Sequence, residues 1–215
     1  MKRKIIAGIL IIMGLAIMSA PLYWRWSGNR RNEQMVQEIE QIIEQETENE
    51  EEEDHGQTAL EAAISEEDAA ALSKEEVIGL IEIEALDIKY AVLEGAGSYE
   101  LSCGIGHISD TAGIGEVGNC VLAGHNGSRH GTYFTNLKTL KEGDVIKLTD
   151  KKGNQYFYVA ESMKVVGPYD NSVKDQGDAV ELTLLTCENS GTMRLVVSCT
   201  LFEVKQSQNE KEAAE

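Results

Sequence analysis

Positive charge is scarce in this sequence. Its 215 residues include 19 lysines and arginines against 37 aspartates and glutamates, so the formal net charge is −18 at pH 7. Between Val77 and Val204 the chain has 17 acidic and 10 basic residues, a net charge of −7 that leaves −11 on the flanking segments. The phosphates of nucleic acid would meet a field of their own sign. We therefore exclude nucleic acid as a partner.

Cysteine and paired metal ligands are also few. The chain has four cysteines, none of them in a CxxC pattern: Cys103, Cys120, Cys187 and Cys199. His130 follows His125 by five positions, but no cysteine pair or carboxylate at suitable spacing accompanies them. The sequence therefore predicts no metal site and no cofactor. An exported chain could oxidise a pair of its cysteines, so their disulfide state is left open.

One long apolar run is present, at the N-terminus. It extends from Ile5 to Tyr23 without a charge and is followed by Trp24 and Trp26. A helix needs about 20 apolar residues to cross a bilayer, and tryptophan suits the membrane interface. We expect residues 1–26 to be a retained single-pass anchor in the cell membrane, with the rest of the chain extracellular. The alternative is a cleaved signal peptide, because Met18-Ser-Ala20 offers small residues to a peptidase.

Residues 27–72 are predicted to form an acidic, partly helical extracellular linker. From Glu38 to Asp54 there are ten acidic residues and no lysine or arginine, which is typical of a self-repelling, solvated spacer. Apolar residues recur at helical spacing in its first part: Met35, Val36, Ile39, Ile42 and Ile43. This pattern predicts a short amphipathic or self-associating helix next to the membrane. A stalk with no partner is the simpler interpretation.

Residues 73–205 have the pattern of one folded domain, followed by a polar tail at 206–215. Short apolar, β-rich runs recur between Val77 and Val204, separated by turn signals such as Lys141-Glu-Gly-Asp144. This part of the chain is long enough for one hydrophobic core but not two, and no heptad or internal repeat interrupts it. The pattern predicts a mostly β fold, a closed or nearly closed antiparallel-rich barrel with one or two short helices.

The residues that carry chemistry lie at the ends of three apolar runs. Cys187 ends one run and Arg194 begins the next, with a turn-rich segment at Glu188–Gly191 between them. A tight hairpin there would bring the thiol and the guanidinium within reach of one carbonyl. A thiol nucleophile needs a base or acid beside it. His125 is the only histidine at the end of another apolar run.

These motifs resemble the sortases, the membrane-anchored cysteine transpeptidases of Gram-positive bacteria. Thr183-Leu-Leu-Thr-Cys187 is followed by Arg194, and Ala123-Gly-His125 lies about sixty residues upstream. The similarity extends from Val77 to Val204 and implies the eight-stranded sortase barrel. The N-terminal anchor, with no long lid before the first strand, favours class A or class D. The chain departs from many sortases in having alanine, at Ala85 and Ala91, near places where they carry proline.

The resemblance implies a role for each site residue. Cys187 would be the nucleophile and carry the acyl group as a thioester. His125 would act as general acid and then as general base. Arg194 would donate to the oxyanion or to a substrate carbonyl. Thr186 would bind substrate at the oxyanion hole through side-chain or backbone groups.

We expect a cysteine transpeptidase that cleaves an LPxTG-like sorting signal of surface proteins between Thr and Gly. The acyl chain would pass to an amine of a peptidoglycan precursor in the cell wall. One alternative is a pilin-polymerising sortase with a lysine acceptor. Another is a catalytically silent, membrane-tethered barrel that only binds a partner, against which the intact Cys187, His125 and Arg194 speak.

Overall fold

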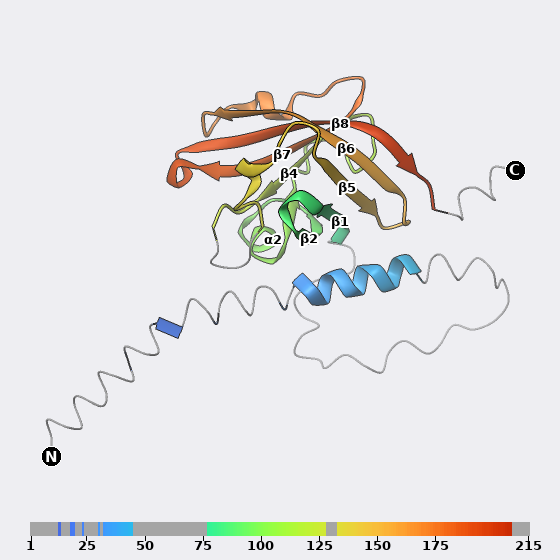
Figure 1. The fold of residues 1–215 in the computed structure, drawn as a ribbon, viewed down its shortest axis with the longest axis horizontal. Helices are drawn as coiled ribbons and strands as arrows, with labels where there is room; N and C mark the ends of the chain where they lie inside the picture. The colour runs from blue at the N-terminus through green and yellow to red at the C-terminus, as the bar shows by residue number, and fades with distance from the viewer. Residues whose placement is uncertain are drawn as a thin grey trace, which may run out of the picture.

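The computed structural model describes residues 32–44, 77–127 and 133–207, together with Met13, Met18, Ser19, Tyr23 and Arg30. Figure 1 shows the described part as a β barrel with one longer helix beside it. Within these residues no helix is both long enough and apolar enough to cross a membrane. Most of the predicted anchor at residues 1–26 and of the linker at 27–72 lies outside the described residues, so the anchor stays a prediction.

Eight strands and a few short helices make up the domain. The strands are β1 Val77–Ile83, β2 Ile88–Glu94, β3 Ile105–His107, β4 Gly118–Gly124, β5 Val145–Asp150, β6 Gln155–Val166, β7 Val180–Glu188 and β8 Met193–Lys205. The helices between them are η1 Glu84–Leu86, α2 Ser98–Cys103, η2 Leu137–Thr139, η3 Asn171–Lys174 and η4 Asn189–Gly191. The predicted mostly β fold with short helices is confirmed.

The sheet closes on itself in the order β1-β2-β3-β4-β7-β8-β6-β5. Two neighbouring pairs are parallel, β2 with β3 and β4 with β7, and the other six are antiparallel. The predicted closed, antiparallel-rich barrel is therefore confirmed. The β4–β7 pair joins segments far apart in the sequence, and it is the pair that assembles the site.

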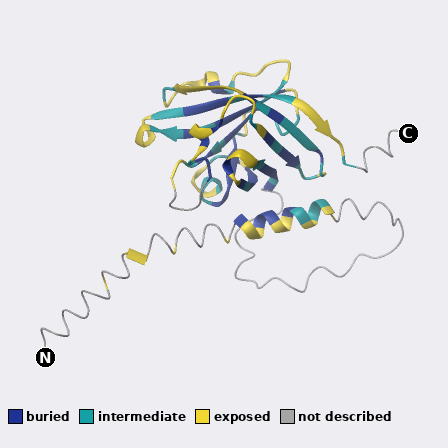
Figure 2. Ribbon diagram, in the orientation of Figure 1, coloured by how far each residue is buried: buried dark blue, intermediate teal, exposed yellow. Residues whose placement is uncertain are grey.

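The barrel interior is filled by side chains from alternate positions of each strand. On β4 and β7 the inward positions include Leu122, Leu182 and Leu184, all fully buried in the core. Each such side chain contributes roughly 1.5–3 kcal/mol by leaving water. Figure 2 shows the central strands as buried and the loops and strand ends as exposed. The intervening residues point to the outer face, where the site lies.

The helix at residues 32–44 packs against the outside of the barrel. Met35, Val36 and Ile39 are buried in a cluster with Leu80 of β1 and Leu93 of β2. Figure 1 shows this helix, in light blue, beside β1, β2 and α2. The predicted amphipathic helix is thus confirmed, but a stalk with no partner is wrong for these residues, because the barrel itself covers the apolar face.

Polar contacts fix the helix along β2. Asn32 is 8% exposed, and its Nδ2 donates to Lys89 O at 2.9 Å. Its Oδ1 accepts from Ala91 N at 3.3 Å. The amide therefore pairs with two backbone groups of β2, as a neighbouring strand would. Lys89 also forms an ion pair with Glu40 of the same helix.

Candidate active site

Cys187 and Arg194 face each other across the last hairpin. They are direct register partners of β7 and β8. Such antiparallel partners have Cα atoms about 4.5–5.5 Å apart and side chains on the same face of the sheet. The turn at η4 is tight because Asn189, Ser190 and Gly191 all have positive φ, at 48°, 57° and 88°. The hairpin thus places thiol and guanidinium side by side on the outer face.

His125 reaches the same place along the parallel neighbour of β7. Gly124 at the end of β4 pairs with Thr186, so His125 and Cys187 are the next residues on adjacent strands. Both lie on the outer face, because the inward Cys120 and Leu182 pair five residues earlier. Asn126 Nδ2 donates to Cys187 O at 2.6 Å. The segment after β4 is thereby attached to the residue that carries the thiol.

Thr186 links the two strands from the inside. It is 3% exposed, and its Oγ1 donates to Gly124 O at 2.7 Å. Neighbouring residues of a strand point to opposite faces, so this hydroxyl lies away from the Cys187 side chain. It positions the strand ends that carry His125 and Cys187. A contact between Thr186 and substrate remains a prediction.

Glycine is required just before His125. A Cβ on Gly124 would lie 2.7 Å from both Ile105 Cδ1 and Phe134 Cδ2, closer than real contacts allow. The backbone of Gly124 therefore lies close to these two side chains. Phe134 N also donates to His125 O at 3.1 Å. The backbone of His125 is therefore held by the segment that follows it as well as by β7.

The guanidinium of Arg194 is folded back on the hairpin turn. Its Nη1 donates to Gly191 O at 2.9 Å and to Met193 O at 3.0 Å. Within the described part of the chain, Nε and Nη2 donate to no residue, and the side chain is half-buried. Arg194 is therefore held in place by one nitrogen and retains other donors on a side chain whose charge is fixed.

The four thiols lie in different surroundings. All are free, and Cys187 is partly exposed whereas Cys103, Cys120 and Cys199 are buried. Burial, together with the charge of Glu116, raises the pKa of Cys120 to about 12, and burial with the charge of Glu161 raises the pKa of Cys199 to about 12. Of the four, only Cys187 combines access with a neighbouring histidine and arginine.

A disulfide between the two barrel cysteines is excluded by register. Cys120 and Cys199 are both partners of Leu182, on opposite sides of β7. Two strand spacings separate their Cα atoms by about 9–10 Å, beyond the roughly 7 Å that a disulfide tolerates. Of the cysteine pairs that the sequence left open, the register therefore excludes Cys120 with Cys199.

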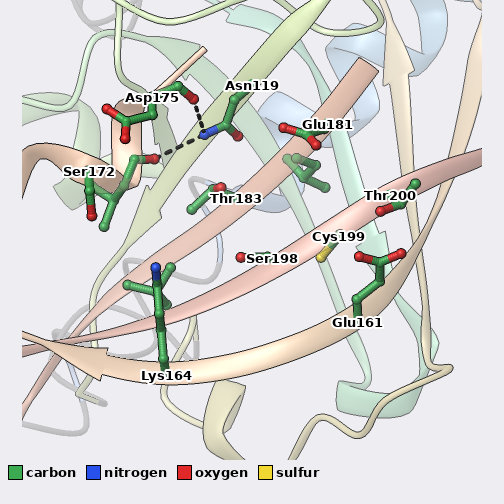
Figure 3. Close-up of a pocket in the computed structure, with 13 residues that line it drawn as sticks. Asn119, Glu161, Lys164, Ser172, Asp175, Glu181, Thr183, Ser198, Cys199 and Thr200 are labelled. Atoms are coloured by element: carbon green, nitrogen blue, oxygen red, sulfur yellow. Dashed lines mark hydrogen bonds between the residues drawn. The ribbon is translucent and has the colours of Figure 1, made fainter. Parts of the chain in front are cut away.

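A pocket of about 240 Å³ continues the outer face away from Cys187. Its floor includes Thr183 of β7 and Ser198 of β8, and η3 closes one side. Asn119 holds η3 there, because its Nδ2 donates to Val173 O at 3.0 Å and to Asp175 O at 3.3 Å. Figure 3 shows these bonds and the ammonium of Lys164 reaching into the pocket. The lining is mostly polar.

Of the remaining histidines the structure describes His107, which lies away from this site. His107 is 4% exposed and is hydrogen-bonded through Nδ1 to Glu94 Oε2 at 2.9 Å and through Nε2 to Ala112 O at 3.0 Å. Both ring nitrogens are thus occupied inside the barrel wall, so His107 has a structural role. His55 and His130 lie outside the described residues. Among the described ones, no three His, Cys, Asp or Glu side chains are grouped so as to hold a metal.

Two residues of the site carry no clear sequence signal. Asn126 directly follows His125, and only its bond to Cys187 reveals its part. Tyr133 packs its ring against His125, with ring centroids 6.1 Å apart. A histidine at a strand end is visible in a sequence, but the side chain that packs beside it is set by the path of the following loop.

Known proteins resemble this chain along most of its length. The family model of the sortase domain matches residues 81–202. Sortase A of Bacillus anthracis is 28% identical and covers 94% of this chain and 95% of its own. Sortase A of Listeria monocytogenes is 31% identical over 56% of this chain and 53% of its own. A solved sortase D5 transpeptidase of Clostridium perfringens is 27% identical, with a TM-score of 0.59, and covers 82% of this chain and 99% of that one.

Proposed function

Because this chain belongs to the sortase family, it is a cysteine transpeptidase of sorting signals, and we propose that Cys187 is its nucleophile, with His125 and Arg194 as its catalytic partners. One observation carries this assignment. The register of β4, β7 and β8 places the three residues at adjacent strand ends on one outer face. A nucleophile, a proton carrier and a fixed cation so arranged fit acyl transfer.

The first half-reaction opens the peptide bond of the sorting signal. The Cys187 thiolate attacks the carbonyl carbon of the threonine in an LPxTG-like signal. The new C–S bond makes a tetrahedral oxyanion, to which Arg194 donates. The C–N bond to glycine then breaks, and the protonated His125 gives its proton to the departing amine. Cys187 is left carrying the acyl chain as a thioester.

The second half-reaction transfers the acyl chain to an amine. The neutral His125 takes a proton from the incoming amine, whose nitrogen attacks the thioester carbon. The C–N bond forms, the C–S bond breaks and the thiolate is regenerated. We propose an amine of a peptidoglycan precursor as acceptor. A lysine side chain of a pilin is the second candidate, and a chain that only binds its partner is the third.

The polar pocket below η3 supports a path for the signal along β7. Thr183 on the pocket floor precedes Cys187 by four residues on the outer face, a distance of about 13 Å along a strand. An extended peptide with its reacting carbonyl at Cys187 therefore reaches the pocket with a residue about four positions away. The acidic and basic side chains there favour a polar residue over an aliphatic one at that position.

We also propose that residues 1–26 anchor the enzyme in the cell membrane with the barrel outside. The apolar run from Ile5 to Tyr23 supports this. Carbonate extraction of membranes tests it: an integral chain stays in the membrane fraction and becomes soluble only in detergent. Release by carbonate alone, or a mature N-terminus after Ala20, would instead support a cleaved signal peptide.

The transfer reaction is tested with the full-length chain and a fluorogenic LPxTG-like peptide library. Each peptide is incubated with and without an added glycine, diaminopimelate-type or lysine-type amine. We expect an amine-dependent ligation product and a mass adduct on Cys187. Cys187→Ala should abolish both, and His125→Gln should lower kcat about 10²- to 10⁴-fold. Arg194→Lys should lower it about 10²- to 10³-fold.

Cys103→Ala is the matched control, because Cys103 is a buried thiol outside the barrel interior. It should leave ligation unchanged. Products separate the remaining possibilities. Hydrolysis with no amine-dependent product indicates a plain protease, and ligation only to the lysine-type amine favours pilin assembly. If Cys187 of the folded chain reacts with a thiol reagent but forms no adduct with any peptide, the result favours a chain that only binds its partner.

A further inference from the structure

Tyr133 lies between the proposed proton carrier and the body of the domain. It is 1% exposed, although it comes from a loop. Its ring and that of His125 have centroids 6.1 Å apart and planes at 79°. This is the edge-to-face arrangement that aromatic rings prefer at 4.5–7 Å. The imidazole, at the open end of β4, is thus bounded on one side by a buried aromatic ring.

The Tyr133 ring is itself fixed from several directions. It stacks on Tyr90 of β2, with centroids 4.9 Å apart and planes at 24°. Tyr133 N donates to Tyr90 Oη at 3.0 Å, and Tyr133 Oη donates to Ser102 O of α2 at 2.9 Å. Tyr133 has a φ of 39°, an unusual value for a bulky residue. The ring stacking and the two hydrogen bonds hold Tyr133 in this backbone conformation.

Tyr90 is in turn held by the strand around it. Its neighbours Lys89 and Ala91 are the two residues whose backbone groups pair with Asn32 of the helix at 32–44. On its other side β2 pairs with β1 through Tyr90 and Ile81. The contacts therefore run without a break from the helix through β2 to Tyr133 and to His125.

We propose that Tyr133 is the positioning residue of the catalytic histidine, holding the imidazole in the rotamer from which it serves Cys187. This inference rests on the proposed function of His125. A general acid must lie within hydrogen-bond reach of the proton that it transfers. His125 is only partly buried, so its side chain has other rotamers, and a misplacement of 1 Å can cost about 100-fold in rate. The Tyr133 ring occupies the space beside the imidazole and so excludes the His125 rotamers that would point there.

The test compares full-length variants at Tyr133 in the ligation assay. Tyr133→Leu removes the ring and should lower kcat about 10- to 100-fold with little change in KM. Tyr133→Phe keeps the ring and should restore most of kcat. Tyr158→Leu is the matched control, because Tyr158 is a fully buried tyrosine in the barrel core. It should lower the melting temperature without lowering kcat.

Two further measurements separate positioning from general damage. In the His125→Gln background, Tyr133→Leu should have no further effect on kcat, since the two changes act through one group. Histidine-selective NMR of the intact chain should show a ring-current shift on the His125 signals that Tyr133→Leu removes and Tyr133→Phe keeps. Should Tyr133→Leu not fold, Tyr90→Phe removes the acceptor of Tyr133 N and should give a smaller loss in the same direction.

A folded Tyr133→Leu protein with wild-type kcat and unchanged His125 signals would overturn the proposal. So would an equal loss of kcat in the His125→Gln background. The proposed function fails differently, when the wild-type chain forms no adduct at Cys187 or His125→Gln is fully active. In that case the NMR signals alone decide whether Tyr133 orients His125.

Discussion

Single hydrogen bonds help to hold the ends of β4 and β7 in register beside His125 and Cys187. The hydroxyl of Thr186 bonds to Gly124 O from inside the barrel, and the amide of Asn126 bonds to Cys187 O outside it. Both join β4, which leads to His125, to β7, which carries Cys187. β4 and β7 are parallel neighbours that lie far apart in sequence. Their register therefore depends on these side-chain hydrogen bonds as well as on the backbone hydrogen bonds between the strands.

Thr186→Val tests the inner bond. The variant keeps the shape of the side chain but leaves Gly124 O without this donor, so the free energy of unfolding should fall by about 1 kcal/mol. The rate of acyl-enzyme formation should fall as well, because the end of β4 can shift. Urea denaturation and rapid-quench mass spectrometry measure the two effects. Thr186→Ser retains the hydroxyl and should keep the rate; equal loss in both variants would contradict the role of the bond.

Glu94 makes the barrel less stable at acidic pH. Burial alone would raise its pKa, but hydrogen bonds from Ser109 and His107 and the charge of His107 outweigh this and lower the pKa below 4.5. A carboxyl with a lowered folded pKa contributes stability above its unfolded pKa. That contribution is lost as pH falls through the folded value.

We therefore expect the free energy of unfolding to fall as the pH is lowered below about 4.5, and to fall less steeply in Glu94→Gln. Urea titrations at several pH values between 3 and 6 measure the slope. Parallel curves for wild type and variant would show that Glu94 does not contribute to it. Glu94 lies at the end of β2 away from the Cys187 hairpin, so the variant should retain ligation at neutral pH.

Among the elements, the helix at residues 32–44 departs most from its sequence interpretation. Its periodicity predicts an apolar face, but nothing local says what covers that face. The cover comes from β1 and β2, and from Cys103 at the end of α2. The periodicity of a dozen residues predicts an apolar face but cannot identify the distant segment that packs on it. The hydrogen bonds of the Asn32 amide to β2 could not be predicted from the sequence either.

Ile39→Ala tests the docking of this helix. Ile39 is 2% exposed, and removing such a side chain typically costs about 2–5 kcal/mol. The loss of stability cannot exceed the free energy with which the helix packs on the barrel, because beyond that limit the helix detaches. Calorimetry should show a lower melting temperature, and limited proteolysis should cut the segment sooner. Gln37→Ala, on the exposed face of the same helix, is the control, and equal melting temperatures would argue against docking.

Across the whole molecule, much of the architecture could be predicted from local pattern. Short apolar, β-rich runs between turn signals indicated the strands, and the turn-rich segment at Glu188–Gly191 indicated the approach of Cys187 and Arg194. The strand order could not be predicted this way. The parallel pairing of β4 with β7 is a long-range choice. His125 was predicted as the partner of the thiol by its place at the end of an apolar run and by the resemblance of Ala123-Gly-His125 to the sortases, not by a predicted strand pairing.

The closed barrel makes thiol reactivity a measure of global folding. Cys120 and Cys199 lie inside the barrel, where burial raises the pKa of each to about 12. With an aromatic disulfide reagent at pH 8, we expect rapid modification of Cys187 alone in the native chain. All four thiols should react in 6 M guanidinium chloride. Rapid native modification of Cys199 would show that the barrel opens more readily than the closed sheet implies.

The division of β4 and β7 into inward and outward residues has an evolutionary consequence. Inward residues that fill the core alternate with outward residues along these strands and along β8, so that a substitution at Thr183 or Ser198 changes the lining of the polar pocket without opening a void among the leucines of the core. Such a scaffold can acquire new recognition by drift at outward positions while selection preserves the inward ones.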